Sequence, residues 1–147
     1  MIRLGAGLYE EIVRHAEKEY PRECCGLLVG RIEDGGRTRA VLETHPVENT
    51  FEEGERHHRM SIEPREYARA ERRHAGRGLG VVGNYHSHPD HPAVPSQFDL
   101  EHLAPWTTMS YVVVSVREGK AVDFRSWELE ADRSRFSEEE VRRDAEP

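Results

Sequence analysis

The chain combines stretches with apolar residues at helical spacing and short apolar runs rich in β-branched residues. Leu8, Ile12 and Ala16 recur every four residues before Pro21, which is typical of an amphipathic helix that ends at a proline. A continuous apolar run such as residues 80–85 is typical of a buried strand. The pattern predicts helices over residues 8–20, 64–75 and 97–103 and strands over residues 25–32, 37–46, 58–62, 80–88, 110–116 and 120–129. This order predicts an α/β fold in which helices flank a mixed β-sheet.

The length of the chain suits one domain. A chain of 147 residues is large enough to bury one hydrophobic core. We expect this domain to cover residues 1–130. Residues 131–147 are dense in charge and poor in apolar side chains, so we expect a charged C-terminal tail or an exposed helix there.

Charge and composition narrow the classes of partner. The formal net charge is -7 at pH 7, and the sequence has no basic stripe with interleaved aromatic residues, which argues against nucleic acid and favours a partner with a basic face. The first residues lack the blocks of a secretory signal, and no apolar run reaches the length of a membrane span. Cys24 and Cys25 are adjacent and form no Cys-x-x-Cys motif. We therefore expect a cytoplasmic protein with buried thiols and no membrane partner, and we leave a homo-oligomer open.

Three candidate zinc ligands and a hydroxyl lie close together in the sequence. His86 and His88 stand at i and i+2 near the end of a predicted strand, so both point to the same side. Asp99 follows a proline-rich loop and lies three residues after Ser96, on the same face of a predicted short helix. Two imidazoles and one carboxylate are a set that binds zinc and leaves a fourth position for water, as in catalytic zinc sites.

Each of these features also has an ordinary structural interpretation. Ser96 and Asp99 fit a helix N-cap with an acidic residue at the third helical position, and taken alone that interpretation is the better one. The pattern His-x-His-Pro-x6-Ser-x-x-Asp rarely arises by chance, so the whole pattern favours a metal site. The other candidate histidines are assigned to the surface or to the surroundings of the site: His57, His58, His74, His91 and His102.

The string GNYHSHPDHPAVPSQFD, residues 83–99, resembles the JAMM motif of the MPN-plus metallopeptidases. The string PRECCGLLVG, residues 21–30, is similar to the segment that carries the catalytic glutamate of that family. The resemblance extends over residues 8–130 and implies a single MPN (JAMM) domain with cytidine-deaminase-like layering. Asn84 departs from the family, which more often has an apolar or aromatic residue there; we expect its side chain to point away from both histidines.

The resemblance also implies a function for each site residue. His86, His88 and Asp99 correspond to the ligands of a Zn²⁺ ion, Glu23 to the general base and Ser96 to a residue that assists the oxyanion. Zinc can lower the pKa of its bound water to about 7, and a nearby carboxylate can accept the proton and pass it to the leaving amine. From the residues alone Glu23 is one acid among many, so its assignment depends on the resemblance.

The substrate is also suggested by the resemblance. Small bacterial members of the family are associated with ubiquitin-like sulfur carriers of the ThiS/MoaD type, from whose C-terminal Gly-Gly they remove an added amino acid or peptide. The chain resembles this group because it has little room for the insertions of larger deubiquitinating members. A zinc metallopeptidase or isopeptidase acting on such a carrier is therefore expected. Two alternatives stay open: a noncatalytic MPN-like binding module, which the complete ligand set disfavours, and a zinc hydrolase of small amides, which the motif does not separate from a peptidase.

Overall fold

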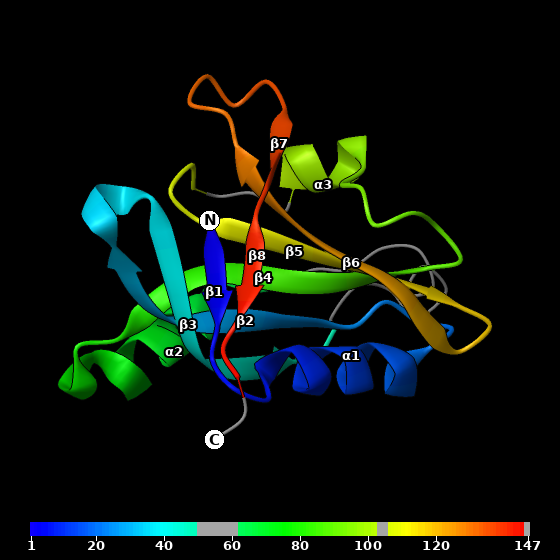
Figure 1. Cartoon of the computed structure of the whole chain (residues 1–147), viewed down its shortest axis with the longest axis horizontal. Helices are drawn as coiled ribbons and strands as arrows, with labels where there is room; N and C mark the ends of the chain where they lie inside the picture. The colour runs from blue at the N-terminus through cyan, green and yellow to red at the C-terminus, as the bar shows by residue number, and fades with distance from the viewer. Residues whose placement is uncertain (50–61, 103–105, 146–147) are drawn as a thin grey trace.

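The computed structural model describes residues 1–49, 62–102 and 106–145, and its elements are shown in Figure 1. In chain order they are β1 (Ile2–Leu4), α1 (Leu8–Glu19), β2 (Cys25–Glu33), the 3-10 turn η1 (Asp34–Gly36), β3 (Thr38–Val47), α2 (Pro64–His74), η3 (Ala75–Arg77), β4 (Gly80–Pro89), α3 (Gln97–His102), β5 (Ser110–Arg117), β6 (Lys120–Leu129), β7 (Phe136–Glu139) and β8 (Val141–Arg143). The predicted α/β fold with a mixed sheet and flanking helices is confirmed. Of the strand expected over residues 58–62, only Ile62 is among the described residues.

The described strands form one mixed sheet in the order β7-β6-β5-β4-β2-β3-β1-β8. Strand β4 is antiparallel to β2 and parallel to β5, so it is hydrogen-bonded along both sides. Strands β7 and β8 stand at opposite ends of this order, although only Glu140 separates them in the chain. The backbone N–H of Ile2 in β1 donates to the Glu140 carbonyl at 3.0 Å. The sheet is therefore curled so that one C-terminal segment joins its two ends (Figure 1).

This C-terminal segment corrects an expectation from the sequence. An exposed helix or a tail was expected after residue 130, but residues 136–139 and 141–143 are strands that pair with β6 and β1. The segment has few apolar residues because each short strand covers only one end of the sheet. Phe136 and Val141 suffice to pack against the core on either face.

Each face of the sheet carries its own hydrophobic cluster. Helix α1 buries Leu8, Ile12 and Ala16, as the four-residue spacing predicted. Helix α2 buries Ala70 against the other face, where Tyr67 also packs. The first cluster contains Ile2, Leu4, Leu8, Ile12, Ala16, Cys24, Leu28, Val41, Val82, Tyr85, Val112, Val114 and Val116. The second contains Cys25, Leu27, Val47, Ala70, Val81, Met109, Tyr111 and Leu129.

The contact between β2 and β4 requires a glycine. Gly26 lies opposite Tyr85, and a Cβ at position 26 would overlap the Tyr85 ring. The ring thus lies across the glycine, and its hydroxyl is 2.8 Å from His15 Nδ1 on α1. This packing fixes the position of β4 at Tyr85, the residue before His86.

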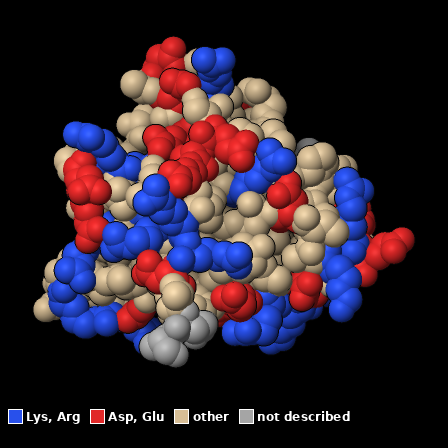
Figure 2. All heavy atoms as spheres, viewed as in Figure 1, with Lys and Arg blue, Asp and Glu red and all other residues tan. Residues whose placement is uncertain are grey.

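Charged side chains of both signs are mixed on the surface. Figure 2 shows acidic and basic groups interspersed over one face of the molecule, so neither sign covers that face alone. Among the described residues, no helix is long and apolar enough to cross a membrane.

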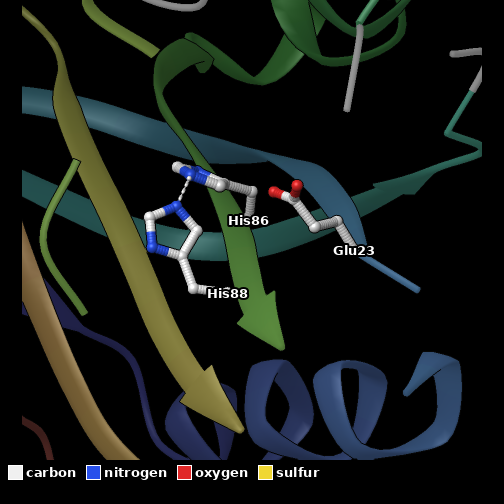
Figure 3. A group of neighbouring side chains, drawn as sticks. All are labelled: Glu23, His86 and His88. Atoms are coloured by element: carbon white, nitrogen blue, oxygen red, sulfur yellow. Dashed lines mark hydrogen bonds between the residues drawn. The ribbon is translucent and has the colours of Figure 1, made fainter. Parts of the chain in front are cut away.

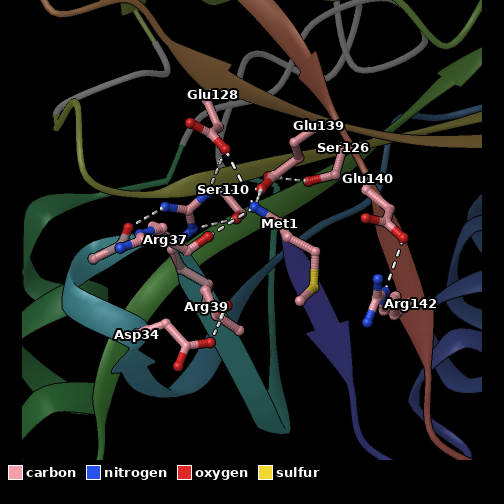
Figure 4. A network of polar contacts seen from close by, with 12 residues as sticks. Met1, Asp34, Arg37, Arg39, Ser110, Ser126, Glu128, Glu139, Glu140 and Arg142 are labelled. Atoms are coloured by element: carbon pink, nitrogen blue, oxygen red, sulfur yellow. Dashed lines mark hydrogen bonds and ion pairs between the residues drawn. The ribbon is translucent and has the colours of Figure 1, made fainter.

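A buried polar network joins four strands where the sheet closes (Figure 4). Arg39 of β3 donates to Ser110 Oγ at 3.0 Å and to Glu139 Oε1 and Glu128 Oε1, each at 2.7 Å. Ser126 Oγ donates to the other Glu139 oxygen at 2.7 Å. The side chains of Arg39 and Glu139 are only 5% and 3% exposed. A buried carboxylate is stable here because a guanidinium and a hydroxyl satisfy both of its oxygens.

We expect Arg39→Met to lower the free energy of unfolding by up to about 3–5 kcal/mol, because the buried Glu139 carboxylate loses the guanidinium and keeps only the N-terminal ammonium of Met1 as a cation. Urea denaturation measures this change. Arg125→Met is the matched control, since Arg125 pairs with Glu138 at the surface and such pairs contribute less than about 1 kcal/mol. Equal losses in the two variants would contradict the role given to the Arg39 network.

Candidate metal centre

Strand β4 holds both candidate histidines in the middle of the sheet. His86 lies between Cys25 of β2 and Val113 of β5, and His88 lies beside Ser115 of β5. Alternation along the strand places both imidazoles on one face. His86 is 1% exposed and His88 9%, so their positions are set by backbone bonds and packing rather than by free side-chain rotation.

Asp99 reaches the same place from α3. Ser96 Oγ accepts the backbone N–H of Asp99 at 3.1 Å, and Asp99 Oδ2 accepts the backbone N–H of Ser96 at 2.8 Å. These reciprocal bonds form the capping arrangement that the sequence offered as an alternative to a metal site. The same Oδ2 atom also faces both histidines, so the side chain that closes the cap is also the candidate ligand.

The three candidate ligand atoms form a small triangle. His86 Nε2 lies 3.0 Å from His88 Nε2 and 3.1 Å from Asp99 Oδ2, and His88 Nε2 lies 3.2 Å from Asp99 Oδ2. Metal–ligand bonds of about 2.0–2.1 Å in a tetrahedral zinc site place neighbouring ligands about 3.3–3.4 Å apart. The observed spacing is within a few tenths of an ångström of this value, so the donor set fits zinc.

A hydrogen bond fixes the ring of His88. Its Nδ1 lies 2.9 Å from the Pro92 carbonyl oxygen, which can only accept. Nδ1 therefore carries the hydrogen, and Nε2 of the neutral ring presents its lone pair to the other candidate ligands. Such a bond to the second ring nitrogen is typical of histidines that bind metals.

Electrostatics keep Asp99 ionised. Burial alone would raise the pKa of its carboxyl, but the charge and hydrogen bonds of His86 and His88 outweigh burial and hold that pKa well below its usual range. The pKa of His88 is raised: burial opposes its charged form, but the hydrogen bond and charge of Asp99 favour it more. A carboxylate that stays charged is a suitable ligand for a divalent cation.

Glu23 lies next to these residues (Figure 3). It is 3% exposed, and ligand-type atoms of Glu23, His86 and His88 all lie within 4.8 Å of one another. Burial raises the pKa of the Glu23 carboxyl to about 8, an effect that His88 opposes and Asp99 reinforces. A divalent cation at the histidines would favour the carboxylate form and so lower this pKa. A buried carboxyl that titrates near neutral pH is suited to accepting and returning a proton.

The loop between the histidines and Asp99 is anchored to the sheet at several points. Ser115 Oγ donates to the His91 carbonyl at 2.5 Å, and Trp127 Nε1 donates to the Ala93 carbonyl at 3.1 Å. Tyr20 also donates through its hydroxyl to Asp90 at 2.8 Å. These bonds hold the two parts of the candidate ligand set in a defined relation.

A cavity of about 370 Å³ opens onto the candidate site. A larger cavity of about 810 Å³ lies between α2 and α3, and its lining includes none of the candidate ligands, Glu23 or Ser96. We associate the chemistry with the smaller cavity because it contains Glu23, His88 and Ser96. Its lining residues are Glu23, His88, Pro89, His91, Pro92, Val94 and Ser96.

The other candidates from the sequence have different outcomes. His102 is exposed and stacks on Phe98 with ring centroids 4.3 Å apart, away from the candidate ligands. His74 was expected at the surface, but it is 3% exposed and bonded to Arg77, so that expectation was wrong. His74 points inward from the last turn of α2, whose other residues are exposed. His57 and His58 lie outside the described residues.

The expectation for the two cysteines is confirmed, whereas the expectation for Asn84 is wrong. Cys24 and Cys25 are free and buried, as predicted, and burial raises the pKa of Cys24 to about 12, which keeps its thiol protonated. Asn84 was expected to point away from both histidines, but Asn84 and His86 share a strand face. Its amide donates to Tyr67 of α2 at 3.0 Å, on the histidine side of the sheet.

The family is established by comparison with known proteins. The chain matches the model described as prokaryotic homologs of the JAB domain over residues 5–130. The chain belongs to this family, and its predicted membership among small prokaryotic JAMM/MPN proteins is confirmed.

Individual relatives differ in how much of their length is matched. The chain is 35% identical over 107 residues to tail tip assembly protein K of Escherichia phage N15, covering 69% of this chain and 38% of the phage protein. It is 31% identical over 118 residues to desampylase of Haloferax volcanii, covering 78% and 80% of the two chains. A JAB1/MPN domain protein of Archaeoglobus fulgidus shares the fold, with a TM-score of 0.60 at 18% identity over 98% of this chain and 97% of its own. The chain thus spans little more than a third of the phage protein and most of the desampylase.

We expect purified protein to bind one zinc ion, and the third ligand can be identified by two isosteric changes. Changes at residues that contact metal ligands typically weaken metal binding about 10–100-fold. Asp99→Asn changes a proposed ligand itself and should weaken zinc binding by more than this, whereas Glu23→Gln should retain the ion. Competition with a chromogenic chelator measures both affinities. His102→Ala is the control for loss of an imidazole outside the site. Loss of zinc in Glu23→Gln with retention in Asp99→Asn would instead assign Glu23 as the ligand.

Proposed function

We propose that this protein is a zinc-dependent metallopeptidase that hydrolyses the bond after the C-terminal Gly-Gly of a ubiquitin-like sulfur carrier of the ThiS/MoaD type. The observation that carries the proposal is the triangle of His86, His88 and Asp99 with a buried carboxyl, Glu23, beside it. A binding module would need only a folded surface, and it would have no use for a general base at a complete ligand set.

The proposed chemistry divides among these side chains. His86, His88 and Asp99 would hold the ion, which when bound supplies a Lewis acid that acidifies water and polarises a carbonyl. Glu23 accepts a proton from the attacking water on its carboxylate and returns it to the leaving amine. Burial raises the pKa of Glu23 and a cation at the histidines would oppose this shift, so the carboxylate form that accepts the proton is available near neutral pH.

Ser96 is the candidate residue for stabilising the developing negative charge. Its Oγ accepts a hydrogen bond from Asp99 within the cap, which leaves the hydroxyl hydrogen available for donation. Ser96 is exposed to the cavity that Glu23 and His88 also line. We therefore propose that the Ser96 hydroxyl donates to the carbonyl oxygen of the scissile bond as it becomes anionic.

The cavity and a relative support the proposed substrate. A cavity of about 370 Å³ with proline and valine in its walls suits an extended segment without side chains, such as Gly-Gly. The desampylase of Haloferax volcanii, whose length this chain largely covers, supports a protein-modifier substrate. We also propose a cytoplasmic location, which agrees with two free thiols.

We expect the zinc-loaded protein to remove a peptide extension from a ThiS/MoaD-type carrier, and Glu23→Gln to lower kcat about 10²–10⁴-fold, since the proton has no acceptor. Intact mass spectrometry follows the loss of the extension. A carrier that ends at Gly-Gly is the substrate control, and Glu101→Gln on the exposed face of α3 is the variant control. Hydrolysis of small dipeptides without cleavage of the carrier would shift the assignment to a small-amide hydrolase. A kcat in Glu23→Gln equal to that of the parent protein would contradict the role of Glu23 as general base.

Variants of Ser96 separate catalysis from capping. Ser96→Gly should lower kcat by about 10²–10³-fold through loss of the donor while costing only a few tenths of a kcal/mol of stability, because glycine is tolerated at an N-cap. Ser96→Thr keeps the hydroxyl and should retain most of the rate. Steady-state kinetics and thermal unfolding on the same samples test both statements. A Ser96→Gly variant with an unchanged kcat would show that the residue is only a cap.

A further inference from the structure

The position of Glu23 is not set by a helix or a strand. It lies in the connection between the last residue of α1, Glu19, and the first residue of β2, Cys25. A catalytic carboxyl in such a segment needs other contacts to hold it, because a displacement of about 1 Å can lower a rate about 10²-fold. The backbone bonds on either side of Glu23 therefore decide where its carboxyl lies.

Ser87 supplies two of these bonds. The backbone N–H of Cys24 donates to Ser87 Oγ at 2.8 Å, and the backbone N–H of Ser87 donates to the Cys24 carbonyl at 3.1 Å. Ser87 is 0% exposed and Cys24 is 2% exposed, so water does not compete for either bond. The side chain of Ser87 thus continues the β2–β4 pairing one residue beyond the strand, up to the neighbour of Glu23.

The geometry of β4 explains how Ser87 can contact the segment of Glu23 while its two neighbours in the strand are the candidate ligands. His86 and His88 point to one face of β4, so Ser87 between them points to the opposite face, where Cys24 packs against α1. Asn49 donates its side-chain N–H to the Glu23 carbonyl at 3.2 Å. The carbonyl of Glu23 and the N–H of Cys24 belong to one peptide group, so this group is held at both of its polar atoms, and the acceptor of its N–H is the residue that links the two histidines.

We propose that Ser87 is a positioning residue that fixes Glu23 relative to the His86–His88 pair through the hydrogen bond from the Cys24 N–H to its Oγ. This inference rests on the proposed function, because it assumes that Glu23 acts on the substrate. Without the hydroxyl, the buried N–H of Cys24 lacks its acceptor, and the segment must shift to satisfy it.

Ser87→Thr and Ser87→Val form a matched pair, because both add a methyl group and only valine lacks the hydroxyl. We expect kcat for the carrier to be about 10–100-fold lower in Ser87→Val than in Ser87→Thr, with similar KM and similar zinc content. Combined with Glu23→Gln, the valine change should lower the residual rate by less than about twofold, because the two residues act through one group. The proposal would be overturned if Ser87→Val lowered kcat as much in the Glu23→Gln protein as in the parent protein. Equal kcat values for Ser87→Thr and Ser87→Val would also overturn it.

Two measurements do not depend on turnover. Amide hydrogen exchange by NMR should show faster exchange at Cys24 in Ser87→Val than in Ser87→Thr, and crystal structures of the zinc-loaded variants should show the Glu23 carboxyl displaced only in the valine protein. Unchanged exchange and an unmoved carboxyl would overturn the positioning role. If the parent protein cleaves no carrier, the proposed function fails, while these two measurements still decide whether Ser87 holds Glu23.

Discussion

The alternation of side chains along β4 is the constraint on which the site depends. This strand is bonded on both sides, so its register with β2 and β5 cannot slip without moving every residue to the wrong face. His86 and His88 therefore face Asp99, and His88 also lines the cavity, while Tyr85 and Ser87 lie on the face that α1 covers. One strand thus carries two candidate metal ligands on one side and the residues that support them on the other.

The sequence predicted the parts of the molecule that have strong local patterns. Helix α1 follows from its apolar spacing, and β4 and β5 follow from continuous apolar runs. Strand β1 and the pair β7 and β8 were missed because three or four residues carry too little periodicity, and Glu139 reads as a surface acid unless Arg39 is known to lie beside it. The pairing of β1 with β8 joins segments more than a hundred residues apart, which a local pattern does not show.

The candidate site was also predicted from the sequence only in part. His86, His88 and Asp99 were placed together from their spacing, and the structure brings their ligand atoms within 3.2 Å of one another. The sequence treated an N-cap and a metal ligand as competing interpretations of Asp99, and the geometry accommodates both. Asn84 was assigned the wrong face through an error in strand parity. Ser87 gave no signal of its own, because a serine between two histidines looks like a spacer until the position of Cys24 is known.

The anchored loop after β4 bears on whether the domain needs a metal ion in order to fold. Its bonds to Ser115, Trp127 and Tyr20 are made entirely by protein groups, and so is the cap that orients Asp99. These hydrogen bonds would hold the candidate ligands together without help from an ion, unlike the ligands of a zinc finger, whose chain folds only around its ion. A chelator should therefore leave the domain folded.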